Sequence, residues 1–244
     1  VLLQLIAANL LVWAALRIVG IAQFIGAGEP EVVSEARLCS WVGLLSPVDV
    51  WLSRPWGLLT YMFAQWEVLH LLFNMLWLYW FGRIYLEFSS ERRLLMLYLI
   101  GGLAGGLLFL AAGFLPAFAG HGGLLVGSSA SVLAIVTATA LRVPDYPIGL
   151  LLIGTVRLKW IALVAIVFVL IGVTGTNAGG AMAHIGGIAA GAGAFYYSRT
   201  YKPRRRKRPV ASKTTDANAD LDELLDKLKR SGYAGLSASE RKRL

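Results

Sequence analysis

The sequence is short of charge and almost free of cysteine. Only 15% of its 244 residues are charged, against about 25% in an ordinary soluble domain. Hydrophobic residues make up 57% of the chain, and the mean hydropathy is +0.65. The single cysteine, Cys39, excludes an internal disulfide and a cysteine-rich metal site. These deficits disfavour a water-soluble globular domain, and we expect the chain to fold in lipid.

Long apolar runs take the place of charge. A bilayer core of about 30 Å requires about 20 apolar residues per helix, because lipid cannot satisfy the polar groups of an open backbone. The runs predict an all-α membrane protein, a bundle of six transmembrane helices at residues 2–22, 67–88, 94–115, 127–142, 158–174 and 179–198.

Two connections between these runs have their own character. The run 148–154 is apolar but too short to span a membrane, and we interpret it as an interfacial loop. The connection between the first two spans, about 40 residues, is too long for a simple turn. Its tryptophans Trp41, Trp51 and Trp56 suit a membrane interface and predict a partly embedded, structured first loop.

The distribution of basic residues predicts how the protein is oriented in the membrane. Residues 199–244 contain 14 basic and 6 acidic side chains, so the rest of the chain is nearly neutral. Cytoplasmic loops of membrane proteins are enriched in Lys and Arg. We therefore expect a multi-pass protein of the bacterial inner (plasma) membrane with both termini in the cytoplasm, where the loops carry Arg92, Arg93, Arg142, Arg157 and Lys159.

The charge pattern also predicts three parts: a membrane core at 1–198, a basic juxtamembrane segment and linker at 199–218, and a small amphipathic helical cytoplasmic tail at 219–244. The basic run 199–209 adjoins a span, which favours anionic lipid over nucleic acid as its partner. In the tail, Leu221, Leu224, Leu225 and Leu228 share one helical face. Ser237 with Glu240 predicts a capping box at the start of a second short helix.

Four polar side chains lie where lipid disfavours them: His70, Asn74, Ser129 and His184. His70 and Asn74 are four residues apart and so share a helical face. In the predicted topology, the second, fourth and sixth helices all descend from the outer surface, which brings the four groups to a similar depth.

These residue types suit acyl transfer. A serine needs an adjacent base to become a nucleophile, and a histidine can accept a proton and return it to a leaving amine. Ser129 and His184 would supply this pair. His70 and Asn74 could supply donors for the developing oxyanion. His184, Gly187 and Gly191 fall on one stripe, and small residues at this spacing allow close packing of the fourth and sixth helices.

Together these motifs resemble the rhomboid intramembrane serine proteases. The matching elements are His70-x-x-x-Asn74, Gly127-x-Ser129 and Ala183-His184-x-x-Gly187-x-x-x-Gly191, within residues 1–198. The resemblance implies a dyad of Ser129 and His184 without a carboxylate. It also implies an oxyanion hole from the Ser129 backbone N–H, His70 and Asn74, transmembrane proteins as substrates, and no cofactor or metal.

The sequence departs from the family pattern at four positions. Ala130 replaces a common glycine, Leu133 a common aromatic residue, and Gln65 a frequent histidine. Gly57 stands after Trp56, where the family usually has arginine. None of these positions transfers a proton, so they bear on the orientation of the histidine and the stability of the first loop.

Other interpretations remain open at this point. Ser128 competes with Ser129 as nucleophile, although the Gly-x-Ser register favours Ser129 and Ser128 fits a helix-start hydroxyl. We expect Ser131 to point away and bond back to the chain, and His121 to be a solvated loop residue. A His-Glu-x-x-His motif and a pair of intramembrane aspartates are both missing from the sequence. Three histidines could in principle bind zinc, but no carboxylate or second cysteine assists. An inactive rhomboid-like scaffold or a small transporter is the alternative without catalysis.

Overall fold

The computed structural model describes residues 1–46, 48–115, 123–150, 154–172, 178–200 and 214–241. The chain divides into two compact units, Val1–Tyr201 and Lys202–Leu244. The first unit contains all four candidate site residues, and the second contains the tail. His121 lies outside the described residues, so its predicted place in a loop stays a prediction.

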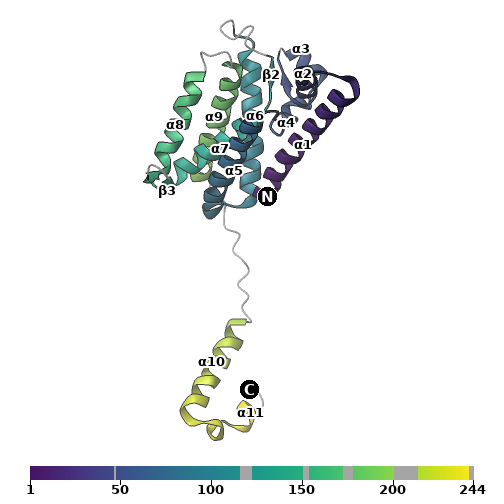
Figure 1. The fold of residues 1–244 in the computed structure, drawn as a ribbon. Helices are drawn as coiled ribbons and strands as arrows, with labels where there is room; N and C mark the ends of the chain where they lie inside the picture. The colour runs from purple at the N-terminus through teal and green to yellow at the C-terminus, as the bar shows by residue number, and fades with distance from the viewer. Residues whose placement is uncertain (47, 116–122, 151–153, 173–177, 201–213, 242–244) are drawn as a thin grey trace. The chain divides into compact units, whose positions relative to one another are not determined.

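Each of the six predicted apolar segments contains a helix (Figure 1). Two of these helices, α1 and α6, are long and apolar enough to cross a membrane, while α7 and residues Leu158–Phe168 of α8 form shorter apolar helices. The bounds are α1 Leu2–Ala27, α5 Val68–Phe88, α6 Glu91–Ala112, α7 Ser129–Arg142, α8 Leu158–Gly172 and α9 Ala178–Thr200.

Local capping explains where several helices differ from the predicted bounds. α1 continues to Ala27 and ends at Gly28, whose φ of 67° is the left-handed conformation that often terminates helices. α6 begins three residues before the predicted start, because the Ser90 side chain accepts a hydrogen bond from the backbone of Arg93. α7 begins two residues later than predicted, because Gly127 has a φ of 122°.

The connection between α1 and α5 is structured, as predicted. It contains α2 (Glu31–Val42), β1 (Leu44–Leu45), α3 (Val48–Ser53) and α4 (Gly57–Thr60). β1 pairs antiparallel with β2 (Leu124–Leu125), with Leu44 opposite Leu125. Since β2 directly precedes the turn into α7, this pairing ties the first loop to the start of α7.

The segment predicted as an interfacial loop at 148–154 contains strand instead. β3 (Pro147–Leu150) pairs antiparallel with β4 (Gly154–Arg157). Gly154 has a φ of 82°, which favours glycine at the start of the second strand. At the base of the hairpin Asp145 forms ion pairs with Lys159 at 2.8 Å and Arg157 at 3.3 Å, and Lys159 lowers the pKa of Asp145. The prediction missed this hairpin because its apolar run lacks the alternation of a half-buried strand.

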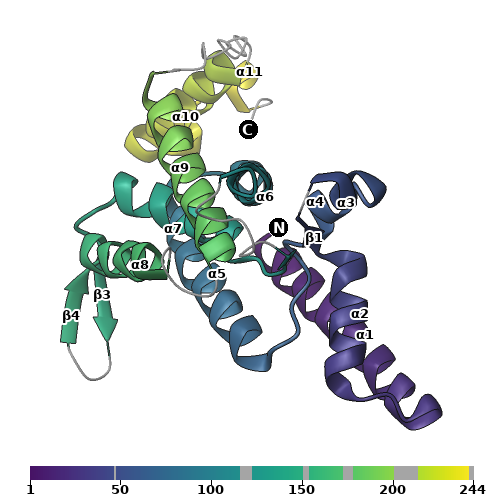
Figure 2. The same cartoon turned by 90° about the horizontal axis from the view of Figure 1, so that it is seen from above.

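α7 lies in the interior of the first unit. Its residues from Ala130 to Ala140 are all buried, and α5, α6, α8 and α9 all contact it. Figure 2 shows α5, α6, α7 and α9 between α1 and α2 on one side and α8 on the other. The side chains of α7 are small or apolar on every face, which suits such a central position. The start of α7, with Ser129, is therefore surrounded by other helices.

In the second unit, α10 (Thr214–Ser231) is followed by the 3₁₀ helix η2 (Tyr233–Gly235) and by α11 (Ala238–Arg241). α10 begins before the predicted end of the linker at 218, because Asp216 and the alanines that follow suit a first helical turn. Leu224 and Leu236 are buried. The predicted capping box is confirmed: the Ser237 N–H donates to Glu240 Oε2 at 2.7 Å, and the Glu240 N–H donates to Ser237 Oγ at 3.3 Å.

Candidate active site

Gly127 shapes the turn that presents Ser129. Its φ of 122° is a conformation that residues with a side chain rarely adopt. A Cβ at this position would also lie 2.8 Å from Cε1 and 3.1 Å from Nε2 of His70. The Gly127 N–H donates to the carbonyl of Tyr61 at 3.0 Å. The glycine therefore allows the imidazole of His70, from α5, to lie against the turn before Ser129.

Ser129 is hydrogen-bonded to His184 across two helices. Ser129 Oγ, in the first residue of α7, lies 2.7 Å from Nε2 of His184 in α9, and both side chains are half-buried. This distance lies within the range of about 2.6–3.2 Å that proton transfer requires. If the hydroxyl donates to Nε2, the neutral ring carries its proton on Nδ1.

Glycines bring α7 and α9 close enough for this contact. A Cβ at Gly187 would collide with the carbonyl oxygen of Ala130, and one at Gly191 would collide with that of Ala134. His184 lies three residues before Gly187, about one turn toward Ser129. The predicted small-residue stripe on this helix is thus confirmed as the contact with α7.

The same packing accounts for Ala130. A Cβ built on Gly105 of α6 would lie 2.6 Å from the Ala130 Cβ and 2.8 Å from the carbonyl oxygen of Ala183. Because α6 presents only a hydrogen here, the methyl group of Ala130 is accommodated next to Ser129. Leu133, one turn further along α7, is also buried.

Asn74 is connected to the start of α7 through Gln65. Its side chain is buried, and its Nδ2 donates to Gln65 Oε1 at 2.8 Å. The Nε2 of Gln65 in turn donates to Ser128 Oγ at 3.4 Å. The structure therefore joins Ser129 directly to His184, places His70 against Gly127, and links Asn74 to the residue before Ser129.

The neighbouring serines have other contacts. Ser128 precedes α7 at its N-cap position, is fully buried, and accepts the bond from Gln65 without capping the helix. Ser131 is also fully buried, with its Oγ 3.9 Å from the sulfur of Met62. The prediction that Ser131 bonds back to the chain is wrong, because α4 and its following turn bring a sulfur acceptor to this face of α7.

Sequence reasoning missed two polar members of this region, Asn9 of α1 and Tyr98 of α6. Both are fully buried, and Asn9 Nδ2 donates to the Tyr98 hydroxyl at 3.0 Å. Asn9 carried a usable signal, since it is an amide in the middle of the first apolar run. Tyr98 carried none, because a tyrosine in an apolar helix is most often a packing residue.

The first loop explains the departure at Gly57. A Cβ at Gly57 would lie 2.5 Å from the carbonyl oxygen of Gly43, so the backbone there leaves no room for a side chain. Arg54 supplies a cation to the loop instead: it donates to the Ser40 carbonyl at 3.2 Å and lies over the ring of Trp41 at 4.6 Å. Trp56 stacks on the same ring, and its Nε1 donates to the Trp41 carbonyl at 2.8 Å.

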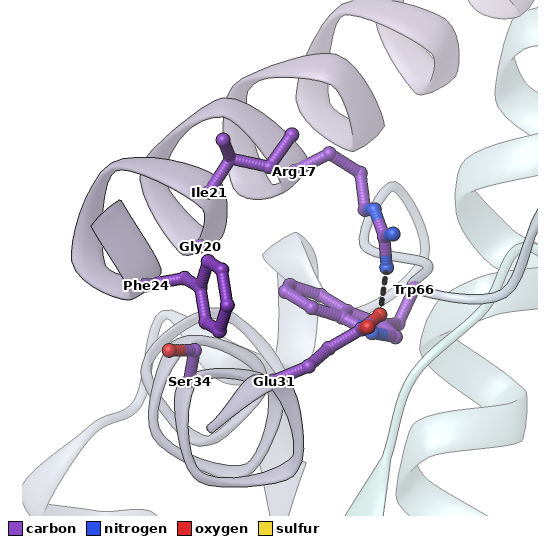
Figure 3. A pocket seen from close by; sticks show the side chains of 7 residues that line it. All are labelled: Arg17, Gly20, Ile21, Phe24, Glu31, Ser34 and Trp66. Carbon is purple, nitrogen blue, oxygen red and sulfur yellow. Dashed lines mark hydrogen bonds and ion pairs between the residues drawn. The ribbon is translucent and has the colours of Figure 1, made fainter. Parts of the chain in front are cut away.

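A pocket of about 170 Å³ lies between α1, α2 and Trp66 (Figure 3). Arg17 spans its rim, with an ion pair to Glu31 at 2.7 Å that lowers the pKa of that carboxyl. The pocket is lined by Arg17, Gly20, Ile21, Phe24, Glu31, Ser34 and Trp66, so it is separate from the candidate site residues. Within the described part of the chain, no three histidine, cysteine or acidic side chains gather as metal ligands.

Comparison with known proteins adds one finding. The model of the Rhomboid domain family matches residues 52–200, which include His70, Asn74, Ser129 and His184. No curated protein matches the chain. The match covers more than half of the sequence and agrees with the resemblance seen in its motifs. The chain belongs to the rhomboid family.

Proposed function

We propose that this protein is an intramembrane serine endopeptidase that hydrolyses peptide bonds in or near the transmembrane helices of other membrane proteins. The distance of 2.7 Å between Ser129 Oγ and His184 Nε2 is the observation that carries the proposal. A serine becomes an effective nucleophile only with a base within hydrogen-bonding reach, and this pair meets that requirement.

The chemistry follows from these two groups. His184 Nε2 accepts the Ser129 proton while Oγ attacks the scissile carbonyl, which becomes an oxyanion. The protonated imidazole then gives its proton to the leaving amine as the C–N bond breaks, leaving an acyl-enzyme. A water molecule, deprotonated by His184, hydrolyses the ester and restores Ser129.

The start of α7 suits stabilisation of the oxyanion. Ser129 is the first residue of a helix of 14 residues, and the first four N–H groups of a helix have no intrahelical partner. The positive end of the helix dipole also points there. The proposal assigns the Ser129 backbone N–H, His70 and Asn74 as donors, and the position of His70 against Gly127 supports its share.

Family membership and the apolar helices α1 and α6 indicate an integral membrane protein with a helical bundle. We extend this to six spans with both termini in the cytoplasm of a bacterial cell, a membrane core ending near residue 198, and a tail outside it. Transmembrane substrates would enter from the lipid. Their helices would have to unwind before a carbonyl could reach Ser129, because helical hydrogen bonds occupy the backbone.

The test combines labelling with cleavage. The purified protein in lipid vesicles is treated with a fluorophosphonate, the adduct is mapped by mass spectrometry, and cleavage of a transmembrane substrate is measured in parallel. We expect the adduct on Ser129, and loss of both labelling and cleavage in Ser129→Ala and His184→Ala. Ser198→Ala, which removes an exposed hydroxyl from α9, is the control. An adduct on Ser128, or cleavage by either dyad variant, would refute the dyad. A wild-type protein that neither reacts nor cleaves would indicate the inactive scaffold.

A further inference from the structure

A network of buried polar side chains crosses the first unit beside the candidate site. Its members come from α1, α5, α6, the residue before α7 and the segment between α4 and α5. They are Asn9, Gln65, Asn74, Tyr98 and Ser128, all buried. Burying an amide without a hydrogen-bond partner destabilises the folded protein. The network is therefore stable only if each of its donors meets an acceptor.

The hydrogen bonds at one end of this network fix the direction of the others. The Tyr98 hydroxyl lies 2.8 Å from the Met62 carbonyl, which can only accept, so the tyrosine donates there. Asn9 Nδ2 lies 2.9 Å from the Leu5 carbonyl, which again can only accept. The amide nitrogen of Asn9 is thereby assigned, and its second N–H donates to the Tyr98 oxygen at 3.0 Å.

The orientation of the Asn9 amide determines the orientations of Gln65 and then of Asn74. Asn9 Oδ1 is an acceptor, so Gln65 must present Nε2 to it, at 3.1 Å. Gln65 Oε1 therefore faces the other way and accepts from Asn74 Nδ2 at 2.8 Å. Asn74 must present its nitrogen rather than its oxygen on this side. One N–H of Asn74 is bound to Gln65, and its second N–H can be offered to an oxyanion.

We propose that Gln65 is a positioning residue: anchored by Asn9 and Tyr98, it sets the orientation of the Asn74 amide so that a donor, and not the carbonyl oxygen, is available to the oxyanion. Without Gln65 the amide of Asn74 can turn over, and its oxygen would repel the developing negative charge. The bond from Gln65 to Ser128 holds the residue before the nucleophile in the same network. This inference rests on the proposed protease function.

The test measures kcat and KM for a transmembrane substrate in vesicles. Gln65→Met keeps the length of the side chain but removes its donor and acceptor. We expect kcat to fall at least about 10-fold, and by no more than the roughly 10²–10³-fold that loss of an oxyanion donor costs, with KM little changed. Gln65→His should retain most of the rate, because a neutral imidazole has one donor and one acceptor. Gln23→Met, the same change in a glutamine of α1 outside the network, is the matched control.

A double-mutant cycle separates positioning from general destabilisation. If Gln65 acts through Asn74, then Gln65→Met has no further effect on kcat in the Asn74→Ala background. Tyr98→Phe tests the far end of the network, because it removes a single hydroxyl. Its effect on kcat should also vanish in the Asn74→Ala background. A wild-type enzyme that cleaves, with Gln65→Met slowing Asn74→Ala as much as wild type, would overturn the positioning role alone. A wild type that neither cleaves nor reacts with fluorophosphonate would overturn the proposed function and the role together.

Discussion

Gly187 lies where α9 crosses α7, and a side chain there would meet the backbone next to Ser129. The collision predicted for a Cβ is with the Ala130 carbonyl oxygen, which cannot rotate away as a side chain could. Forcing a methyl into such a site typically costs about 1–3 kcal/mol. The two helices must separate, and the hydrogen bond between Ser129 and His184 would lengthen.

We therefore expect Gly187→Ala to slow cleavage by about 10²-fold, since a displacement of about 1 Å in a reacting group has this effect. Gly193→Ala adds the same methyl to α9 at a position with no atom within 4 Å, and it should leave the rate unchanged. Cleavage rates and thermal unfolding of both variants in the same vesicles check the prediction. Equal rates for Gly187→Ala and wild type would show that the close packing is not required.

The sequence allowed prediction of residues whose signal is local. Ser129 and His184 were identifiable because each lies in a short spacing motif, and a hydroxyl or an imidazole in an apolar segment is costly without a purpose. Gln65 was visible only as a departure from the family pattern. Its partners Asn9, Asn74 and Ser128 come from three other segments, and no pattern along the chain states which polar groups will meet.

The start of a helix was predictable where neighbouring residues form a capping motif. The box of Ser237 and Glu240 is such a signal, and it precedes α11 as expected. The β3–β4 hairpin was not predictable, because short apolar runs fit strand, helix and loop alike. The turn at Gly127 was missed for a different reason: its conformation is set together with His70, which is distant in sequence.

The capping box makes a prediction for α11. Lys227 and the groups of Ser237 lower the pKa of Glu240 to about 2. A carboxyl with a lowered pKa stabilises the fold above its ordinary pKa and loses this effect as the pH falls toward the lowered value. Glu240 is therefore charged at neutral pH, and Ser237→Ala tests the cap itself. Loss of a serine cap costs about 1 kcal/mol.

We expect Ser237→Ala to raise amide hydrogen exchange at residues 238–241 of the full chain about fivefold, which corresponds to that cost at 25 °C. Ser231→Ala, which removes an exposed hydroxyl that donates back to the Lys227 carbonyl within α10, should leave exchange there unchanged. The measurement is hydrogen exchange with mass spectrometry at neutral pH. Similar exchange in both variants would show that α11 is held by other contacts, such as the ion pair of Lys227 with Glu240 at 2.7 Å.

At the scale of the whole molecule, the apolar runs were sufficient to predict a membrane bundle, which family membership supports. They could not predict which helix would be central. α7 is the shortest of the helices in the six apolar segments, yet its residues 130–140 are buried on every side. Hydropathy alone cannot distinguish contact with lipid from contact with protein, because both favour the same side chains.

The division into two units predicts that the tail is dispensable for cleavage. The unit Val1–Tyr201 contains Ser129, His184 and every member of the buried polar network. The helices α10 and α11 belong to Lys202–Leu244. Changes at independent sites usually leave each other's energies unaltered within about 0.3–0.5 kcal/mol, which is about a twofold change in rate. Deleting residues 210–244 should therefore keep kcat/KM for a transmembrane substrate within about twofold of wild type, when both proteins are compared in vesicles of one composition. The same deletion in the Ser129→Ala background controls for contaminating proteases. A truncated protein that unfolds at the wild-type temperature but no longer cleaves would show that the tail acts on the catalytic unit.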